Sequence, residues 1–282
     1  MIEDLQITVL VEDRARAGLQ PEVGLALWIA ADHDRLLLDT GAGEALFVNA
    51  EACGIDLRTV DAVVLSHGHR DHSGGLGRLL EVAPEAQVYF HPAAIEPRFS
   101  SRRGPPRPIG MGIDAISALA RRQLRGSEGW HPVAPAIWCG GAIPRRPDEQ
   151  STDPHLWADP LGRRPDPLPD DQALVLQTRA GLVVCCGCCH AGLGPTLRHV
   201  QARFPDEGIA VVLGGFHLKA AAPGEILATA ELLAGSDIGQ IIAGHCTGGA
   251  AEDLLGSLCG SRFAKLIGGD RWRWTGGRLE RE

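Results

Sequence analysis

The sequence has no apolar run of the roughly 18 residues that a membrane-spanning helix requires, so no membrane contact is expected. It also has no excess of positive charge: 27 Lys and Arg stand against 35 Asp and Glu, a formal net charge of -8. Phosphate backbones are held by surplus Lys and Arg, so nucleic acid is not an expected partner. The first six residues are acidic and lead directly into a strand-like segment, which argues against a secretory signal.

The cysteines lack the spacing of a secreted disulfide framework. Four of the eight stand together in the run Cys185-Cys186-Gly187-Cys188-Cys189. A second C-x-x-C pair at a distance, as in zinc and iron–sulfur sites, is missing. On a strand, Cys185 and Cys186 point to opposite faces and pack as small apolar residues, and Cys189 is expected to pack as well. Free thiols and a cytoplasmic location are therefore expected.

The hydrophobic periodicity predicts strands in the first part of the chain and alternating strands and helices later. Strands are expected at 7–11, 24–30, 36–39, 61–65, 87–90, 173–177, 182–186, 209–213 and 240–243. Helices are expected near 44–53, 76–82, 194–204, 223–233 and 250–258. With 44% hydrophobic residues in 282, one large domain can form a core. The pattern predicts an α/β fold with mixed sheets and outer helices.

Residues 93–170 differ from the rest of the chain in composition, with Pro, Gly and Arg enriched around one amphipathic stretch at 113–124. Long irregular segments inside a domain are usually functional or disordered, so an inserted cap or lid is predicted here. Its arginines include Arg98, Arg102, Arg103 and Arg107. Guanidinium groups pair with phosphate or carboxylate, so Arg102 and Arg103 are candidates to bind an anionic substrate, with a solvated loop as the alternative. Trp130, Trp138 and Trp157 either line the pocket or pack the cap.

A dense group of metal-binding side chains follows the expected strand at 61–65. It is the motif H-x-H-x-D-H, made of His67, His69, Asp71 and His72. Neutral imidazoles with one carboxylate are a common ligand set for a divalent transition metal. Placed on a turn after a strand, they point to one side. The motif therefore predicts a metal site.

Three further histidines follow strands in a similar way. His190, His217 and His245 each come after an apolar strand and a glycine-bearing turn. Loops that leave strand ends gather at one edge of an α/β sheet, where ligands bind. We therefore expect these histidines to meet the first group.

Together with Leu38-Asp39-Thr40-Gly41, these motifs resemble the metallo-β-lactamase superfamily. Residues 187–192, 214–218 and 244–248 are similar to one subgroup, the metal-dependent hydrolases of β-lactamase superfamily II, which includes dihydropterin-ribofuranosylaminobenzene 5'-phosphate synthase-like proteins. The resemblance implies a single domain over 1–282, built as a four-layer αββα sandwich with mixed sheets and a cap inserted at 93–170.

The resemblance also implies two divalent metal ions, with zinc expected and manganese or iron as alternatives. The first ion would be held by His67, His69 and His190. The second would be held by Asp71, His72 and His245. Asp39 would orient the histidine loop. Gly187-Cys188 stands where many relatives carry Gly-Asp, so Cys188 is a candidate for the bridging ligand, and Asp171 or Asp170 lies near the usual third-histidine position.

The leading functional prediction is a dinuclear hydrolase, in which a metal-activated hydroxide attacks an ester-like or phosphorylated small metabolite. Asp71 would orient the hydroxide, and His217 would protonate the leaving group. A pterin-related, methanopterin-type synthase or a phosphodiesterase is the main alternative. A di-iron oxygen-reducing protein would need a carboxylate where His69 stands, and a non-catalytic metal or thiol module would use the Cys185–Cys189 run. The expected partner is an anionic small molecule, and a homo-oligomer is left open.

Overall fold

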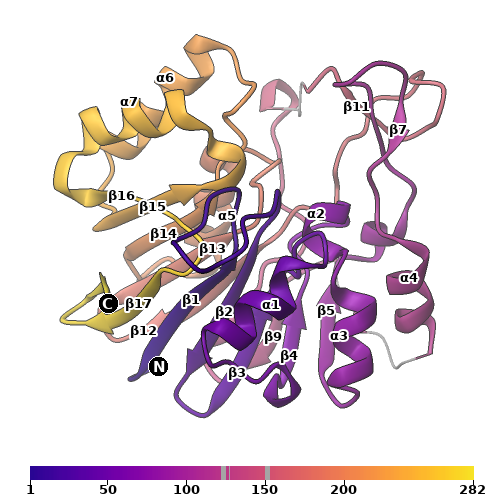
Figure 1. Cartoon of the computed structure of the whole chain (residues 1–282). Helices are drawn as coiled ribbons and strands as arrows, with labels where there is room; N and C mark the ends of the chain where they lie inside the picture. Colours follow the sequence, from indigo (N-terminus) through magenta and orange to yellow (C-terminus); the bar gives the residue numbers. More distant parts are fainter. Residues whose placement is uncertain (122–124, 127, 150–152) are drawn as a thin grey trace.

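The computed structural model describes residues 1–121, 125–126, 128–149 and 153–282. Two mixed β-sheets lie face to face, and helices cover their outer sides (Figure 1). The expected strands and helices recur in it within a few residues, except that positions 122–124 of the amphipathic stretch lie outside the described part. No helix in that part is both long and apolar enough to span a membrane.

The first sheet has the strand order β18-β17-β1-β2-β3-β4-β5-β8. These strands are β1 (Leu5–Val11), β2 (Ala26–Ala31), β3 (Asp34–Leu38), β4 (Ala62–Val64), β5 (Gln87–Phe90), β8 (Arg125–Gly126), β17 (Arg271–Thr275) and β18 (Arg278–Arg281). β1, β2 and β3 pair antiparallel, whereas β3, β4 and β5 pair parallel. The loops after β3 and β4 therefore leave from the same edge, which brings Asp39 beside the H-x-H-x-D-H motif.

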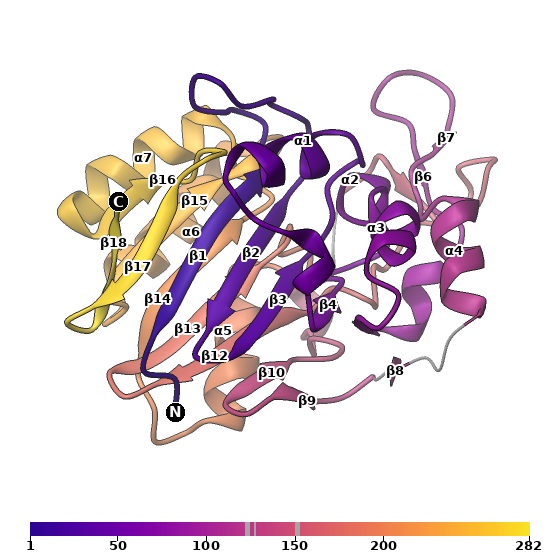
Figure 2. The same ribbon diagram turned by 60° about the horizontal axis from the view of Figure 1, so that its bottom comes forward.

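The second sheet has the order β16-β15-β14-β13-β12-β10-β9. Its strands are β9 (His131–Ala134), β10 (Ile137–Cys139), β12 (Ala173–Thr178), β13 (Gly181–Cys186), β14 (Ile209–Gly215), β15 (Gln240–Gly244) and β16 (Phe263–Lys265). β13 to β16 run parallel to one another. Figure 2 shows this sheet lying behind β1 to β4 of the first. The parallel strands deliver their following loops, with His190, His217 and His245, to one edge.

Alternating side chains build the layers. From β13, Val183 and Cys185 face the core between the sheets, while Val184 and Cys186 face the helices outside, as the strand period of two requires. The helices of that outer layer are α5 (Leu193–Arg203), α6 (Pro223–Ala234) and α7 (Gly249–Cys259). On the other side, α1 (Ala45–Ala52), α3 (Leu76–Val82) and α4 (Ile113–Ala120) cover the first sheet. All eight cysteines are free thiols.

Residues 93–170 are divided between two places. β8, β9, β10 and α4 belong to the main layers, whereas β6 (Phe99–Ser100), β7 (Arg107–Pro108) and β11 (Leu156–Trp157) form a small separate sheet, seen at one end of the molecule in Figure 1. Trp130 and Trp138 pack against Phe204, and the Trp157 indole donates to Ser101. The three tryptophans thus pack the structure, and the extent of the cap remains a prediction.

Candidate metal centre

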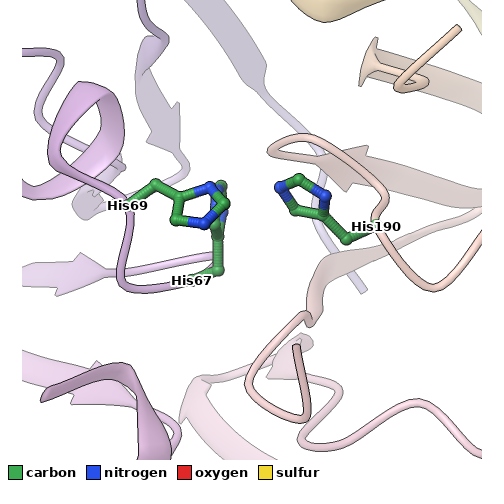
Figure 3. A group of neighbouring side chains, drawn as sticks. All are labelled: His67, His69 and His190. Atoms are coloured by element: carbon green, nitrogen blue, oxygen red, sulfur yellow. The ribbon is translucent and has the colours of Figure 1, made fainter. Parts of the chain in front are cut away.

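The loop after β4 carries the first half of the centre. His67 and His69 lie before the short helix α2 (Arg70–Ser73), which carries Asp71 and His72. The Nε2 atom of His67 lies 3.0 Å from Nδ1 of His69. Figure 3 shows these two rings on one side and His190, from a loop of the second sheet, pointing toward them. The two sheets therefore contribute to a single group of imidazoles.

Asp39 holds this loop through hydrogen bonds to Ser66 and His72. Its carboxylate accepts hydrogen bonds from the backbone N–H and hydroxyl of Ser66, at 2.7 and 2.6 Å, and lies 2.7 Å from Nδ1 of His72. Asp39 has a left-handed backbone, with φ of 61°. Because Nδ1 of His72 is bound to the carboxylate, Nε2 is presented to the centre. The contact is the one expected of a carboxylate that orients a metal-binding histidine.

The loops of the second sheet bring the other half. His245, in the turn after β15, places Nε2 3.2 Å from Nε2 of His72, and Asp71 Oδ2 lies 3.8 Å from each of these two nitrogens. The thiol of Cys188 lies 3.1 Å from His72 Nε2. Cys189, His217 and His245 have φ between 51° and 58°. Such conformations cost about 1–3 kcal/mol each and concentrate at functional sites.

Close packing of the loops depends on glycine. A Cβ on Gly187 would lie 1.9 Å from the Ser66 hydroxyl and 2.9 Å from Asp39 Oδ2. A Cβ on Gly68 would lie 1.9 Å from the carbonyl oxygen of Ala94. Glycine at position 187 therefore lets the loops of the two sheets approach this closely, and glycine at position 68 does the same for the loops after β4 and β5 of the first sheet.

The ligand atoms converge in overlapping sets of three, each with its members within 4.8 Å of one another. The sets are His67, His69 and His190; His67, His72 and Cys188; Cys188, His190 and His217; Cys188, His245 and Cys246; and Asp71, His72 and His245. Cys188 belongs to three of them, so its sulfur lies between the two halves. Asp171 belongs to none of the sets found among the described residues.

Several buried nitrogens of the centre have no hydrogen-bond partner. These are Nε2 of His69, both ring nitrogens of His190 and Nδ1 of His217. An unsatisfied buried polar atom costs about 1–3 kcal/mol. A divalent metal ion satisfies such nitrogens directly, and imidazole, thiolate and carboxylate are all ligands of zinc. The residues present therefore fit a metal ion.

Burial keeps three histidines of the centre neutral, whereas at His72, His217 and His245 the effect of burial is outweighed by neighbouring acidic groups, which raise the pKa. Burial lowers the pKa of His67 and His190 well below the ordinary value, and burial lowers the pKa of His69 to about 3. Neutral imidazole is the form that binds metal. For His245, burial acts against a charge, but Cys246, Asp13 and Asp71 outweigh it and raise its pKa to about 9 without a metal.

Three contributors were missed by the sequence reasoning. Asp13 lies 2.7 Å from Nδ1 of His245, Asp153 lies 3.2 Å from Nε2 of His217, and the Cys246 sulfur accepts the backbone N–H of His217 at 3.3 Å. Asp13 follows β1, so its place after a strand was a usable signal. Asp153 lies in irregular chain and offered none.

The arginines of residues 93–170 have different roles. Arg98 is 2% exposed and binds Asp166 at 2.6 Å and Asp170 at 2.7 Å. Arg98 is therefore not available to a substrate, because buried carboxylates already hold its guanidinium. Arg102 pairs with Asp153 at the cavity described below. Arg103 is exposed and does not line that cavity.

Asp170 and Asp171 support the loops. Asp170 accepts the backbone N–H of Gly68, which lies between His67 and His69, at 2.7 Å. Asp171 accepts the N–H of Ala191 at 2.7 Å, beside His190, and burial raises its pKa to about 6. Their contacts position the loops that carry the histidines.

A cavity of about 520 Å³ opens at the centre. His190 and His217 line it from the second sheet, and Arg102, Asp153 and His155 line it from residues 93–170. Small-molecule sites usually measure about 300–1,000 Å³. The cavity is therefore large enough for a metabolite next to the histidines.

The family model described as the metallo-beta-lactamase superfamily matches residues 19–178, more than half of the chain. The chain is also 27% identical to the 7,8-dihydropterin-6-methyl-4-(beta-D-ribofuranosyl)-aminobenzene-5'-phosphate synthase of Methanocaldococcus jannaschii, over 95% of this chain and 96% of that protein. An uncharacterized protein of the same organism is 25% identical over 89% of this chain and 94% of its own length.

Solved structures agree with the sequence comparisons. The crystal structure of Tm1679, a metal-dependent hydrolase of the beta-lactamase superfamily, has a TM-score of 0.81 at 27% identity, covering 95% of this chain and 98% of that one. Zn(2+)-bound PqqB from Methylobacterium extorquens has a TM-score of 0.56 at 12% identity, covering 94% and 99%, and shows the fold alone. The predicted resemblance and fold class are confirmed: the chain belongs to the metallo-beta-lactamase superfamily, a metal-dependent family.

Proposed function

We propose that this protein is a metal-dependent synthase that joins a 7,8-dihydropterin to a ribofuranosylaminobenzene 5'-phosphate. The observation that carries the proposal is the likeness to the M. jannaschii synthase, which extends over 95% of the chain and therefore over both sheets rather than one motif. The main functional prediction from the sequence was a hydrolase, and the comparison favours its alternative.

The centre supplies the groups that such a reaction needs. His67, His69 and His190 are neutral ligands on one side, and Asp71, His72 and His245 form the set on the other, with the Cys188 sulfur between them. We infer room for two divalent ions, with zinc favoured by the mixture of imidazole, sulfur and carboxylate ligands. Divalent ions bound there polarise a substrate oxygen and lower the pKa of a coordinated water.

The chain's own groups complete the site. The Asp71 side chain is 35% exposed, the most open of the His72, His245 and Asp71 set, so its carboxylate is the group placed to accept a proton from an attacking atom. Arg102 is the guanidinium at the cavity, and its charge favours a phosphorylated substrate. The amino nitrogen of the aminobenzene partner would form a bond to the exocyclic carbon at position 6 of the dihydropterin, the bond from that carbon to a phosphorylated leaving group would break, and the proton lost by the nitrogen would pass to Asp71.

Hydrolysis of an ester or phosphoester is the second candidate. It is favoured by the likeness to Tm1679, whose structure is described as that of a metal-dependent hydrolase. In that case the same carboxylate of Asp71 would orient the attacking water and accept its proton, and the products would be an alcohol and an acid or phosphate.

One experiment separates the two candidates. The protein is loaded with Zn²⁺, Mn²⁺ or Fe²⁺ and mixed with a 7,8-dihydropterin activated at its 6-methyl carbon and with ribofuranosylaminobenzene 5'-phosphate, and products are identified by mass spectrometry. A condensed pterin–aminobenzene product supports the synthase. Hydrolysed substrates alone support the second candidate, and no reaction with any metal contradicts both.

The matched control compares two histidines. His67→Ala removes a group of the centre and should abolish both metal binding and turnover. His33→Ala alters an exposed histidine in the turn between β2 and β3 and should leave both unchanged.

A further inference from the structure

His217 has the hydrogen-bonding pattern of a metal ligand. Its Nε2 lies 3.2 Å from the carboxylate of Asp153, while its Nδ1 is buried and has no partner. Its ring centroid lies 4.1 Å from that of His190. We propose that His217 binds a metal ion through Nδ1, together with Cys188 and His190, and that Asp153 orients its ring. The proposal rests on the metal-dependent function proposed above.

Two other histidines of the centre show the same arrangement. His72 has Nδ1 on Asp39 and Nε2 toward the centre, and His245 has Nδ1 on Asp13 and Nε2 toward the centre. Metal-binding histidines almost always give their second ring nitrogen to a carboxylate, carbonyl or water. In His217 the two nitrogens have opposite roles: Nε2 lies on the carboxylate of Asp153, and Nδ1 is the nitrogen left for a metal ion.

The distances allow a shared ion. The ligand atoms of Cys188, His190 and His217 lie within 4.8 Å of one another. Tetrahedral ligands at roughly 2.0–2.3 Å from zinc lie about 3.3–3.8 Å apart, so only a small movement of the side chains is needed. Neither ring nitrogen of His190 has a hydrogen-bond partner. One nitrogen is therefore free to bind an ion, either with Cys188 and His217 or with His67 and His69.

The backbone of His217 is held in place despite its conformation. Its φ is 52°, in the left-handed region that costs a residue with a side chain about 1–3 kcal/mol. Its N–H is bound by the Cys246 sulfur, and the preceding Phe216 N–H donates to the Thr247 hydroxyl at 3.0 Å. The loop after β15 thus fixes the position from which the His217 ring enters the centre.

The same contacts argue against His217 as the proton donor to a leaving group. A proton donor needs a ring N–H within reach of the substrate. Nδ1 has no exposed surface, and Nε2 is held by Asp153, which Arg102 also binds. Through Asp153, residues 93–170 therefore contact the metal centre itself.

The test measures metal binding without any substrate. Co²⁺ is titrated into metal-free protein in competition with a chromophoric chelator, and the visible absorption of bound Co²⁺ is recorded for His217→Ala and Asp153→Asn. We expect His217→Ala to weaken Co²⁺ binding at least tenfold and to change the spectrum. Asp153→Asn should weaken binding by about 10–100-fold, the usual effect of losing a carboxylate behind a ligand histidine.

The control is His155→Ala, because His155 lines the same cavity and belongs to none of the ligand sets among the described residues. It should bind Co²⁺ like the parent protein. If His217→Ala fails to fold, His217→Gln decides by the same readouts, since its amide keeps a donor for Asp153 but offers no imidazole nitrogen.

Unchanged Co²⁺ affinity and spectrum in the folded His217 variant would overturn the ligand role, whatever happens to turnover. A weakened affinity supports it even if no condensed product forms in the substrate assay, which would contradict only the synthase. The two failures are therefore distinguishable.

Discussion

Carboxylates decide which ring nitrogen of each histidine faces the centre. The Asp39 carboxylate is hydrogen-bonded to Nδ1 of His72, and the Asp13 carboxylate is hydrogen-bonded to Nδ1 of His245. Asp13 also pairs with Lys219 at 3.0 Å, and its pKa lies below the ordinary value because His245 and Lys219 outweigh the effect of burial. At the scale of single residues, the centre therefore depends on groups that do not themselves belong to a ligand set.

Asp13→Asn tests this dependence. The amide can still accept the N–H of His245 but carries no charge, so the imidazole becomes a poorer donor to a metal. We expect Zn²⁺ affinity to fall about 10–100-fold, measured by competition with a chelator. Asp253→Asn is the control, because Asp253 is exposed, pairs with Lys265 and belongs to no ligand set among the described residues. Equal affinities for the two variants would show that Asp13 does not act on the metal.

At the scale of elements, the loop after β13 meets the loops after β3 and β4 at a glycine, which leaves room for the side chains of Asp39 and Ser66. Gly187 stands directly over Ser66 and Asp39, which hold the histidine loop. A single sequence does not show that Gly187 makes such a close contact, because a glycine after a strand is also typical of an ordinary turn. The structure identifies it as the contact between the two halves of the centre.

Gly187→Ala should push these loops apart. Overpacking of this kind costs about 1–3 kcal/mol, and we expect a loss of that size in the free energy of unfolding, together with reduced metal content. Urea unfolding and elemental analysis measure the two effects. Gly208→Ala is the matched control, since a Cβ there meets nothing within 4 Å. A Gly187→Ala protein with normal stability and metal content would contradict the close-packing argument.

The segment at 93–170 is joined to the histidine loop by a buried ionic network. Arg98 binds Asp166 and Asp170, and Asp170 in turn holds the backbone of Gly68. The composition of the segment suggested arginines for a substrate. The structure gives Arg98 a structural role instead, because its guanidinium is buried against two carboxylates and is not accessible to a substrate.

Arg98→Met should therefore be strongly destabilising. It leaves two buried carboxylates without their partner, which costs about 3–5 kcal/mol. The free energy of unfolding, from urea titration, measures this. Arg103→Met, at an exposed position of the same segment, should change stability by less than about 0.5 kcal/mol. A loss below about 1 kcal/mol for Arg98→Met would argue against the network.

At the scale of the whole molecule, the metal centre lies where the strand ends of both sheets meet. His67, His69 and His72 come from the first sheet, and His190 and His245 come from the second. An ion bound by both therefore connects the two halves of the sandwich, so metal binding and folding are coupled.

Removal of the metal should lower stability. At a free Zn²⁺ concentration 100 times its dissociation constant, binding to the folded state contributes about 2.7 kcal/mol. Urea midpoints with Zn²⁺ and with an excess of chelator should differ accordingly in the parent protein. The difference should largely disappear in His67→Ala. Identical midpoints with and without chelator in the parent would contradict the coupling.

Local features could be predicted from the amino-acid sequence alone. Strand and helix periodicity predicted the α/β layers, and H-x-H-x-D-H predicted a metal site because its residues lie within six positions of one another. Tertiary structure decided the contacts between distant segments: Asp13 with His245, Asp153 with His217, and Arg98 with Asp170. These pairs depend on how two sheets and an irregular segment pack, and no spacing along the chain encodes that packing. The role of His217 is the clearest case, since the position of both ring nitrogens, rather than its place after a strand, favours a ligand over a proton donor.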